Sequence, residues 1–185
     1  MKYKLSYEVV VRDPKGKVTF REKGKSRSFL KAWNQGLYTQ LTQQGVSITD
    51  TGGFARTIDD NAINFTMKGT ASYGLVLGTD DTPVAIDDYK LGAEIANGYI
   101  ADTMFREASD NTPAVVVGNN CSFKTNRTFV NWSGGSITVK EMGIICVFYS
   151  GGNKYFQVTR DVFVTPLVVV YGGGVVAEYT MEVEA

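Results

Sequence analysis

Four aspartates near the middle of the chain have the types and spacing best suited to chemistry. Asp80 and Asp81 follow an apolar segment, and Asp87 and Asp88 come shortly after them. Carboxylate oxygens that converge from a loop are the ligands that a hard cation such as Ca²⁺ needs, although this spacing is not that of an EF-hand. A structural interpretation explains the same residues, with Asp80 and Asp81 building a turn and Asp87 capping a helix. We favour it, assign no metal ligand, and keep these four aspartates as the candidates for a cation site.

A charged dipeptide, Arg160-Asp161, lies between two strand-like runs. Such a pair either bridges to Glu141 or braces a strand crossing, and we predict a structural ion pair. An active-site role would require a cleft and a carboxylate with a perturbed pKa, and the sequence points to neither.

The residues of the common catalytic sites are missing. The chain has no histidine, which excludes Ser-His-Asp and Cys-His catalysis and the usual histidine zinc sites. Its two cysteines form no CxxC motif, and no glycine-rich loop has the context of a phosphate site. No carboxylate pair stands out for glycoside hydrolysis. The run Tyr171-Gly-Gly-Gly174 indicates a hairpin turn. We expect a protein that is not an enzyme and that carries no cofactor.

Length and net charge limit the number of domains and the classes of function that remain. A chain of 185 residues fits one core, and 19 basic residues balance 19 acidic ones. This balance argues against direct nucleic-acid binding and does little to oppose self-association. Basic residues gather only from Lys15 to Lys31, which indicates a solvated hairpin and loop or, alternatively, a patch that docks on an acidic partner.

The apolar segments and the two cysteines are consistent with production in the cytosol. The first residues alternate polar and apolar, unlike a secretory signal, and no apolar run is long enough to cross a membrane. Cys121 and Cys146 lie in apolar, strand-like surroundings, so we expect two buried free thiols in a reducing compartment.

The N-terminal quarter predicts a hairpin followed by a helix. Residues 3–11 alternate with a period of two, and Asp13-Pro-Lys-Gly16 is a turn sequence that returns the chain into residues 17–23. A helix is predicted over residues 29–43, with Ser28 as its N-cap and Gly45 after its end. Its apolar positions recur every four residues and predict a core-facing stripe of Phe29, Trp33, Leu37 and Leu41.

The rest of the chain indicates strands and turns. A second hairpin is predicted over residues 54–58 and 63–67, a strand over 71–77, and a short helix that begins at Asp87 and packs through Leu91 and Ile95. Residues 99–108 fit either a strand or a helix. Seven further short apolar runs, bounded by glycine-rich turns, follow in 114–117, 121–123, 127–132, 136–148, 154–159, 162–170 and 175–184.

This spacing is typical of an antiparallel β-sandwich or jelly roll. The predicted fold is therefore mainly β, with one amphipathic helix near the N-terminus and one short helix mid-chain. We expect residues 1–185 to form a single β-rich domain, with the hairpin and helix of residues 1–45 packed on the sandwich.

One arrangement of motifs resembles a known family. It runs from Val76-Leu-Gly-Thr79, with Pro83, Asp87 and Leu91, through Glu141-Met-Gly-Ile144, Gly151-Gly152, Thr159-Arg160 and Phe163, to Tyr179-Thr-Met-Glu-Val183. In this order it is similar to a pattern in structural proteins of tailed bacteriophages, and it covers residues 74–183. Asp80-Asp81 departs from the pattern, since the family often has small residues there.

The resemblance implies a virion component that assembles in the host cytoplasm. Its partners would be copies of itself, as a homo-oligomer, and other virion proteins, in a capsid decoration or auxiliary protein or a tail-associated subunit. The alternative is a carbohydrate- or receptor-binding β-sandwich module, for which the aromatic candidates are Trp33, Trp132, Tyr149, Tyr155 and Tyr171.

Overall fold

The chain folds mainly into antiparallel strands. The computed structural model describes residues 2–26, 28–42, 44–58, 72–149 and 152–184. Within these ranges there is one helix, α1 (Lys31–Thr42). The strands are β1 (Lys2–Arg12), β2 (Val18–Ser26), β3 (Val46–Thr49), β4 (Ala55–Ile58), β5 (Gly74–Gly78), β6 (Phe105–Arg106), β7 (Asp110–Asn111), β8 (Val115–Val117), β9 (Asn120–Val130), β10 (Ile137–Tyr149), β11 (Asn153–Val169) and β12 (Gly174–Glu184). The prediction of a mainly β protein is confirmed.

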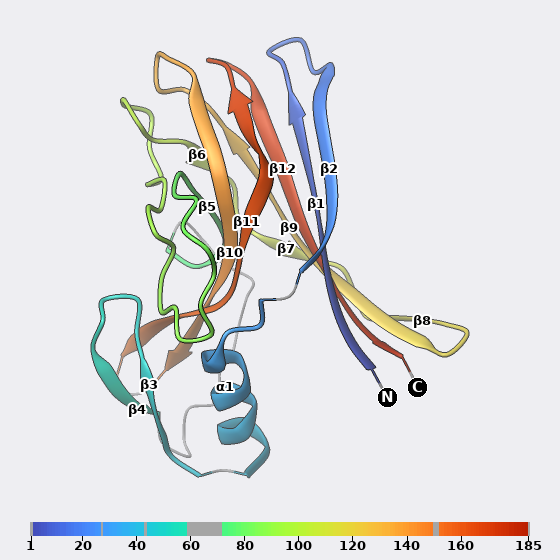
Figure 1. Cartoon of the computed structure of the whole chain (residues 1–185), viewed down its shortest axis with the longest axis vertical. Coiled ribbons are helices and arrows are strands. Elements are labelled where there is room, and N and C mark those ends of the chain that lie inside the picture. The colour runs from blue at the N-terminus through green and yellow to red at the C-terminus, as the bar shows by residue number, and fades with distance from the viewer. Residues whose placement is uncertain (1, 27, 43, 59–71, 150–151, 185) are drawn as a thin grey trace.

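The larger sheet contains both ends of the described chain (Figure 1). Its strand order is β2-β1-β12-β9-β6, and β7 and β8 also pair with β9. The predicted first hairpin is confirmed: the Asp13 carboxylate accepts hydrogen bonds from the backbone N–H groups of Lys15 and Lys17, and Gly16 has a φ of 81°. Positive φ costs glycine little, so this turn sequence closes the hairpin without strain.

The smaller sheet has the order β11-β10-β5, and β3 pairs with β4 in a separate ribbon. Both sheets contribute to one hydrophobic core. Val9, Val175 and Ala177 come from the larger sheet, and Ile144 and Phe148 from the smaller one, and all are buried in the same cluster. The period of two along each strand places these side chains on its inner face.

The chain crosses from the larger sheet to the smaller one just before α1. Leu30 donates from its backbone N–H to the carbonyl of Val158, and Arg160 donates to the carbonyl of Ser28. Residues 28–30 therefore lie along β11 rather than starting the helix. Helix α1 begins at Lys31, and the Ser28 hydroxyl donates to Asp161 instead of capping it, so the predicted start and N-cap were wrong.

The predicted apolar stripe of the helix is only partly correct. Phe29 and Trp33 pack against the core while remaining partly exposed, whereas Leu41 is 82% exposed. The buried positions of α1 are Ala32, Gly36 and Thr39. Small residues at these positions let the helix backbone approach β11 and β3 closely. This close packing decides which face of the helix is buried, and that face is not the one predicted from the larger apolar side chains.

No helix forms at residues 87–95, so the prediction of a mid-chain helix was wrong. The backbone N–H groups of Gly92 and Ala93 donate to the Glu141 carboxylate, and that of Ile95 donates to Leu77 on β5. These donors are then not available for helical bonds. Leu91 and Ile95 are buried as expected, but from an irregular segment.

Other boundaries also differ from the prediction. β9 and β11 are each one long strand where two were expected, and β4 pairs with β3. Residues 63–67 lie outside the described residues. Tyr171-Gly-Gly-Gly174 connects β11 of the smaller sheet to β12 of the larger one, so it is a corner between sheets and not a hairpin. Cys146 is buried as predicted, but Cys121 is exposed.

Candidate functional site

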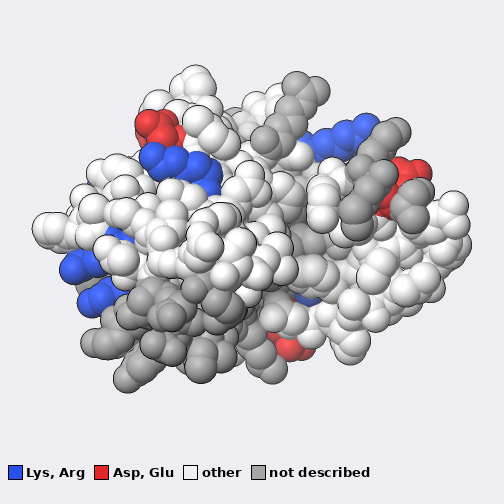
Figure 2. All heavy atoms as spheres, turned by 90° about the horizontal axis from the view of Figure 1, so that it is seen from below, with Lys and Arg blue, Asp and Glu red and all other residues white. Residues whose placement is uncertain are grey.

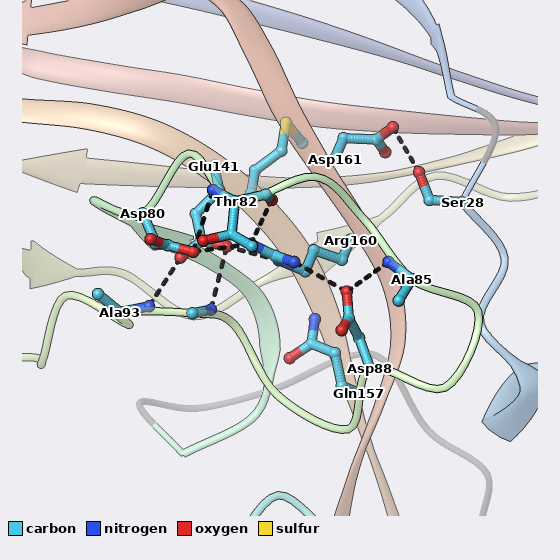
Figure 3. A network of polar contacts seen from close by, with 12 residues as sticks. Ser28, Asp80, Thr82, Ala85, Asp88, Ala93, Glu141, Gln157, Arg160 and Asp161 are labelled. Atoms are coloured by element: carbon cyan, nitrogen blue, oxygen red, sulfur yellow. Dashed lines mark hydrogen bonds and ion pairs between the residues drawn. The ribbon is translucent and has the colours of Figure 1, made fainter.

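The buried side chain of Arg160 lies at the centre of a polar cluster (Figure 3). Arg160 is on β11, and its Nε donates to Glu141 Oε2 on the neighbouring β10 at 2.7 Å. The exposed fractions of the two side chains are 3% and 0%. The predicted ion pair between Arg160 and Glu141 is therefore present, and it is inside the protein.

The other guanidinium nitrogens of Arg160 hold the loop that follows β5. Nη1 donates to Asp88 Oδ2 at 2.8 Å, and Nη2 donates to Asp80 Oδ2 at 3.1 Å and to the carbonyl of Thr82 at 3.0 Å. We call Arg160, Glu141, Asp80, Asp88 and Thr82 the Arg160 cluster. It ties a loop without regular structure to two strands of the smaller sheet, because one planar guanidinium presents several donors in a fixed geometry.

Glu141 also accepts hydrogen bonds from two backbone N–H groups. Its Oε1 accepts from the backbone N–H of Ala93 at 2.9 Å, and its Oε2 also accepts from that of Gly92 at 3.2 Å. A buried carboxylate without such partners would cost several kcal/mol. The two N–H groups and Arg160 together satisfy it.

Three glycines leave room for these contacts. A Cβ at Gly78 would clash with the Glu141 side chain, and a Cβ at Gly92 would clash with Asp80. On β10, a Cβ at Gly143 would clash with Gln157 and with the backbone carbonyl of Thr159. The requirement for glycine at these positions comes from close packing around the cluster, since none of the three has a positive φ.

The pKa shifts of Asp80 and Arg160 favour the charged form of each group. Hydrogen bonds from Thr82, followed by the positive charge of Arg160, hold the pKa of Asp80 below its ordinary value. Burial acts to lower the pKa of Arg160, but hydrogen bonds to Glu141 and Asp88 outweigh it and raise that pKa. Both groups keep their charge through the neutral range.

The four candidate cation ligands have different surroundings. Asp80 and Asp88 contact Arg160, and Asp81 forms an ion pair with Lys140 at 2.8 Å. A hollow of about 690 Å³ lies beside the cluster, and Lys31, Lys90 and Arg160 line it together with Asp80, Asp87 and Asp88. Among the residues with described positions, no group of three or more His, Cys, Asp or Glu side chains is placed to hold a metal ion. Asp80, Asp81 and Asp88 face cationic side chains, which compete with a metal for them.

Asp161, the neighbour of Arg160, belongs to a second buried group. Ser28 Oγ donates to Asp161 Oδ1 at 2.7 Å, and the Tyr179 hydroxyl donates to Asp161 Oδ2 at 2.8 Å. Burial, then the charge of Asp161, raises the pKa of Tyr179 well above its ordinary value. This group links β11, β12 and the crossing segment at Ser28, and the hydroxyls act as donors to a carboxylate rather than as activated nucleophiles.

Two arginines, Arg127 and Arg106, are buried although no feature of the sequence was taken to predict it. Arg127 donates from Nη1 to the carbonyl of Leu75 at 2.7 Å and from Nη2 to that of Tyr73 at 2.8 Å, and burial lowers its pKa to about 10. Arg106 donates to Glu94 and to the carbonyl of Ile95. The signal for Arg127 was available, because it shares the inward-facing period of β9 with Thr125 and Phe129.

The aromatic candidates do not form one group, and among the described side chains only Trp132 and Tyr171 of these candidates meet. Trp33 stacks on Phe29, and Tyr155 lies near Tyr73, in each case partly buried. Trp132 and Tyr171 are exposed and meet edge to face, with ring centroids 5.8 Å apart. Nothing is described for the Tyr149 side chain.

The charged surface is also dispersed. Among the described residues of the lower face, Figure 2 shows basic and acidic side chains in small separate groups. In the basic N-terminal stretch, Arg21 and Lys23 both pair with Glu8. No helix of the described chain has the length and apolar character needed to span a membrane.

Comparison of the chain with models of protein families, with curated proteins and with solved structures finds no match.

Proposed function

We propose that this protein is a non-enzymatic virion structural protein that assembles into symmetric oligomers. It would serve as a capsid decoration or auxiliary protein, or as a tail-associated subunit, of a tailed phage. It would assemble in the host cytoplasm and contact copies of itself and other virion proteins, with no direct contact to nucleic acid or membrane. Its two sheets, with one core between them, would form a β-sandwich of the jelly-roll-like kind.

The observation that carries the proposal is the Arg160 cluster. Two of the segments on which the phage resemblance rests, residues 74–91 and 141–163, meet in it through Asp80, Asp88, Glu141 and Arg160. Every one of these side chains is engaged in holding a loop to the smaller sheet. Such an arrangement supports a structural role for the pattern, because its charged groups are already satisfied by one another.

Exposed apolar side chains support assembly. Val164 on β11 is 90% exposed, and Val168 on the same strand and Val115–Val117 on β8 are also exposed. Apolar side chains on accessible strands favour contact with other protein surfaces. The zero net charge does little to oppose it.

The test is to detect the protein in purified particles and to measure its mass in solution. We expect mass spectrometry of gradient-purified phage to contain this chain at a fixed ratio to other virion proteins, and cryo-EM maps of the particles to show it in symmetric positions. A strictly monomeric protein absent from particles would overturn the proposal.

A second candidate function, binding of a carbohydrate or receptor, is favoured by Trp132 and Tyr171. The turn beneath Trp132 is rigid: Asn131 Nδ2 donates to the carbonyls of Gly135 and Val169, and its Oδ1 accepts from Ser133. Exposed aromatic rings on a fixed turn suit stacking against sugar rings. Glycan-array binding by the purified protein that Trp132→Ala abolishes, and that Tyr3→Ala at another exposed aromatic leaves intact, would support this function. No binding to any glycan would exclude the carbohydrate form of it.

A further inference from the structure

Three connections between strands lie together at the upper end of the molecule (Figure 1). They join β1 to β2, β9 to β10, and β11 to β12. In the larger sheet, Gly174 at the start of β12 pairs with Arg12 at the end of β1 and with Val130 at the end of β9. The connection before β12 therefore lies between the other two. We call residues 12–17, 131–135 and 170–173 the tip.

Hydrogen bonds and close packing hold the tip together. The backbone N–H of Gly172 donates to the carbonyl of Asn131 at 2.8 Å, and that of Asn131 donates to the carbonyl of Gly173 at 2.9 Å. Pro14 Cγ and Trp132 Cζ3 lie 3.4 and 3.7 Å from the place that a Cβ on Gly172 would occupy. The turn between β1 and β2 and the Trp132 ring thus pack at the same glycine.

Trp132 and Tyr171 form the aromatic part of the tip. Their exposed fractions are 41% and 53%, and the planes of their rings meet at 75°. Two rings at this angle bound a corner rather than a flat surface. A sugar ring presents C–H groups on one face, and the electron-rich face of an aromatic ring attracts these hydrogens. The corner therefore fits one compact sugar ring better than a lipid surface.

The tip also carries a local excess of positive charge. Arg12, Lys15 and Lys17 are exposed, and among the described residues no acidic side chain forms an ion pair with any of them. Asp13 is the one acidic residue in the sequence of the tip, and its carboxylate accepts from the backbone N–H groups of Lys15 and Lys17. Three cations and one carboxylate give the tip a net charge of +2 in a chain whose net charge is zero.

We propose that the tip binds an acidic saccharide, with a sugar ring stacked in the corner of Trp132 and Tyr171 and a sugar carboxylate held by the basic side chains beside Asp13. The proposal rests on the second candidate function and names the class of its ligand. Charge complementarity selects this class, because a carboxylate adds charge-assisted hydrogen bonds to the stacking, whereas a neutral sugar gains the stacking alone.

The test is an NMR titration of the full chain with matched pairs of sugars. The acidic probes are trimers of galacturonate, glucuronate and mannuronate, and the neutral ones are the matching trimers of galactose, glucose and mannose. Each acidic trimer differs from its match only by carboxylates in place of hydroxymethyl groups. We expect at least one acidic trimer to bind at least about tenfold more tightly than its match. Raising the salt from about 0.05 M to about 0.5 M should narrow this difference, because ions screen exposed charges.

The variants locate the binding at the tip. Combining Lys15→Ala with Lys17→Ala should weaken binding of the acidic trimer at least about tenfold and leave binding of its neutral match unchanged. Trp132→Ala should weaken both, and the indole N–H signal that it removes should be the one that shifts in the wild type. The control combines Lys31→Ala with Lys90→Ala, which removes the same charge from exposed lysines beside the Arg160 cluster and should bind like the wild type.

Thermal unfolding would first establish that each variant is folded. Equal affinity within every pair of trimers, or wild-type affinity after loss of Lys15 and Lys17, would overturn the acidic ligand. Binding of neutral trimers that requires Trp132 would then leave the second candidate function standing, whereas absence of binding to all trimers would overturn both.

Vesicles of phosphatidylcholine and phosphatidylserine, which carry no sugar, test the alternative of a membrane surface. We expect no binding to them. Binding that depends on Lys15 and Lys17 would assign the tip to anionic lipid and overturn the saccharide. The virion role is tested separately in purified particles, and none of these results changes it.

Discussion

Arg160 Nε donates to Glu141 Oε2 at 2.7 Å across neighbouring strands of the smaller sheet, at a site that is almost closed to solvent. The pair is completed by loop residues that are distant in sequence from both partners. Its main consequence is mechanical, because it fixes the loop after β5 against the sheet.

Replacement of Arg160 by methionine should destabilise the protein by about 3–5 kcal/mol, because the Glu141 carboxylate would remain buried without its cation. The measurement is the free energy of unfolding in urea. Arg12→Met, at an exposed arginine, should change it by no more than about 0.5 kcal/mol. Adding Glu141→Gln to Arg160→Met should restore part of the loss, since the neutral amide still accepts from Ala93. Strict additivity of the two substitutions would contradict an energetic coupling between them.

Gly143→Ala should cost about 1–3 kcal/mol, because the new Cβ meets the backbone carbonyl of Thr159, which cannot move without disturbing β11. Gly135→Ala is the matched control, since no atom lies within 4 Å of a Cβ built there and its φ is not positive. The comparison is made by thermal unfolding of both variants. Equal melting temperatures would show that the strands can separate around residue 143.

Tyr179 should make stability sensitive to alkali. Its pKa is raised in the folded state, so the unfolded chain releases the phenolic proton first, and the free energy of unfolding should fall as the pH rises above about 10. Tyr179→Phe should be less stable by about 1–3 kcal/mol at pH 8, because Asp161 loses a donor. This gap should narrow by pH 11, as the wild type loses its additional stability. Urea unfolding at the two pH values would measure it, and a constant gap would contradict the raised pKa.

The two thiols should differ in reactivity. Cys121 is exposed, whereas Cys146 is fully buried and burial raises its pKa, which lowers the thiolate fraction. Iodoacetamide at pH 8 should therefore add one label to the native protein and two to the unfolded one. Intact-mass and peptide mass spectrometry would count and locate the labels. Rapid labelling of Cys146 in the native protein would contradict its burial.

Local pattern was a good guide to the strands and a poor one to the loops between them. The alternation of residues 3–11 and the turn at residues 13–16 predicted β1 and its hairpin, because period and turn geometry are encoded within a few neighbouring residues. The pattern of residues 87–95 predicted a helix in the same way and was wrong. A short helix is only marginally stable alone, and the buried carboxylate of Glu141 takes two of the backbone donors that this helix would use.

By itself the sequence determined the mainly β character and the first hairpin, since both follow from periodicity and turn residues. It offered the pairing of Arg160 with Glu141 as one of two alternatives, and the structure decided between them. Only the tertiary structure decided that Asp80 and Asp88 join that pair, that the Ser28 hydroxyl donates to Asp161 instead of capping a helix, and that β8 pairs with β9. Those outcomes depend on which segments meet in space. Burial determines how much each contact contributes, because a polar group excluded from water costs free energy unless it forms a hydrogen bond.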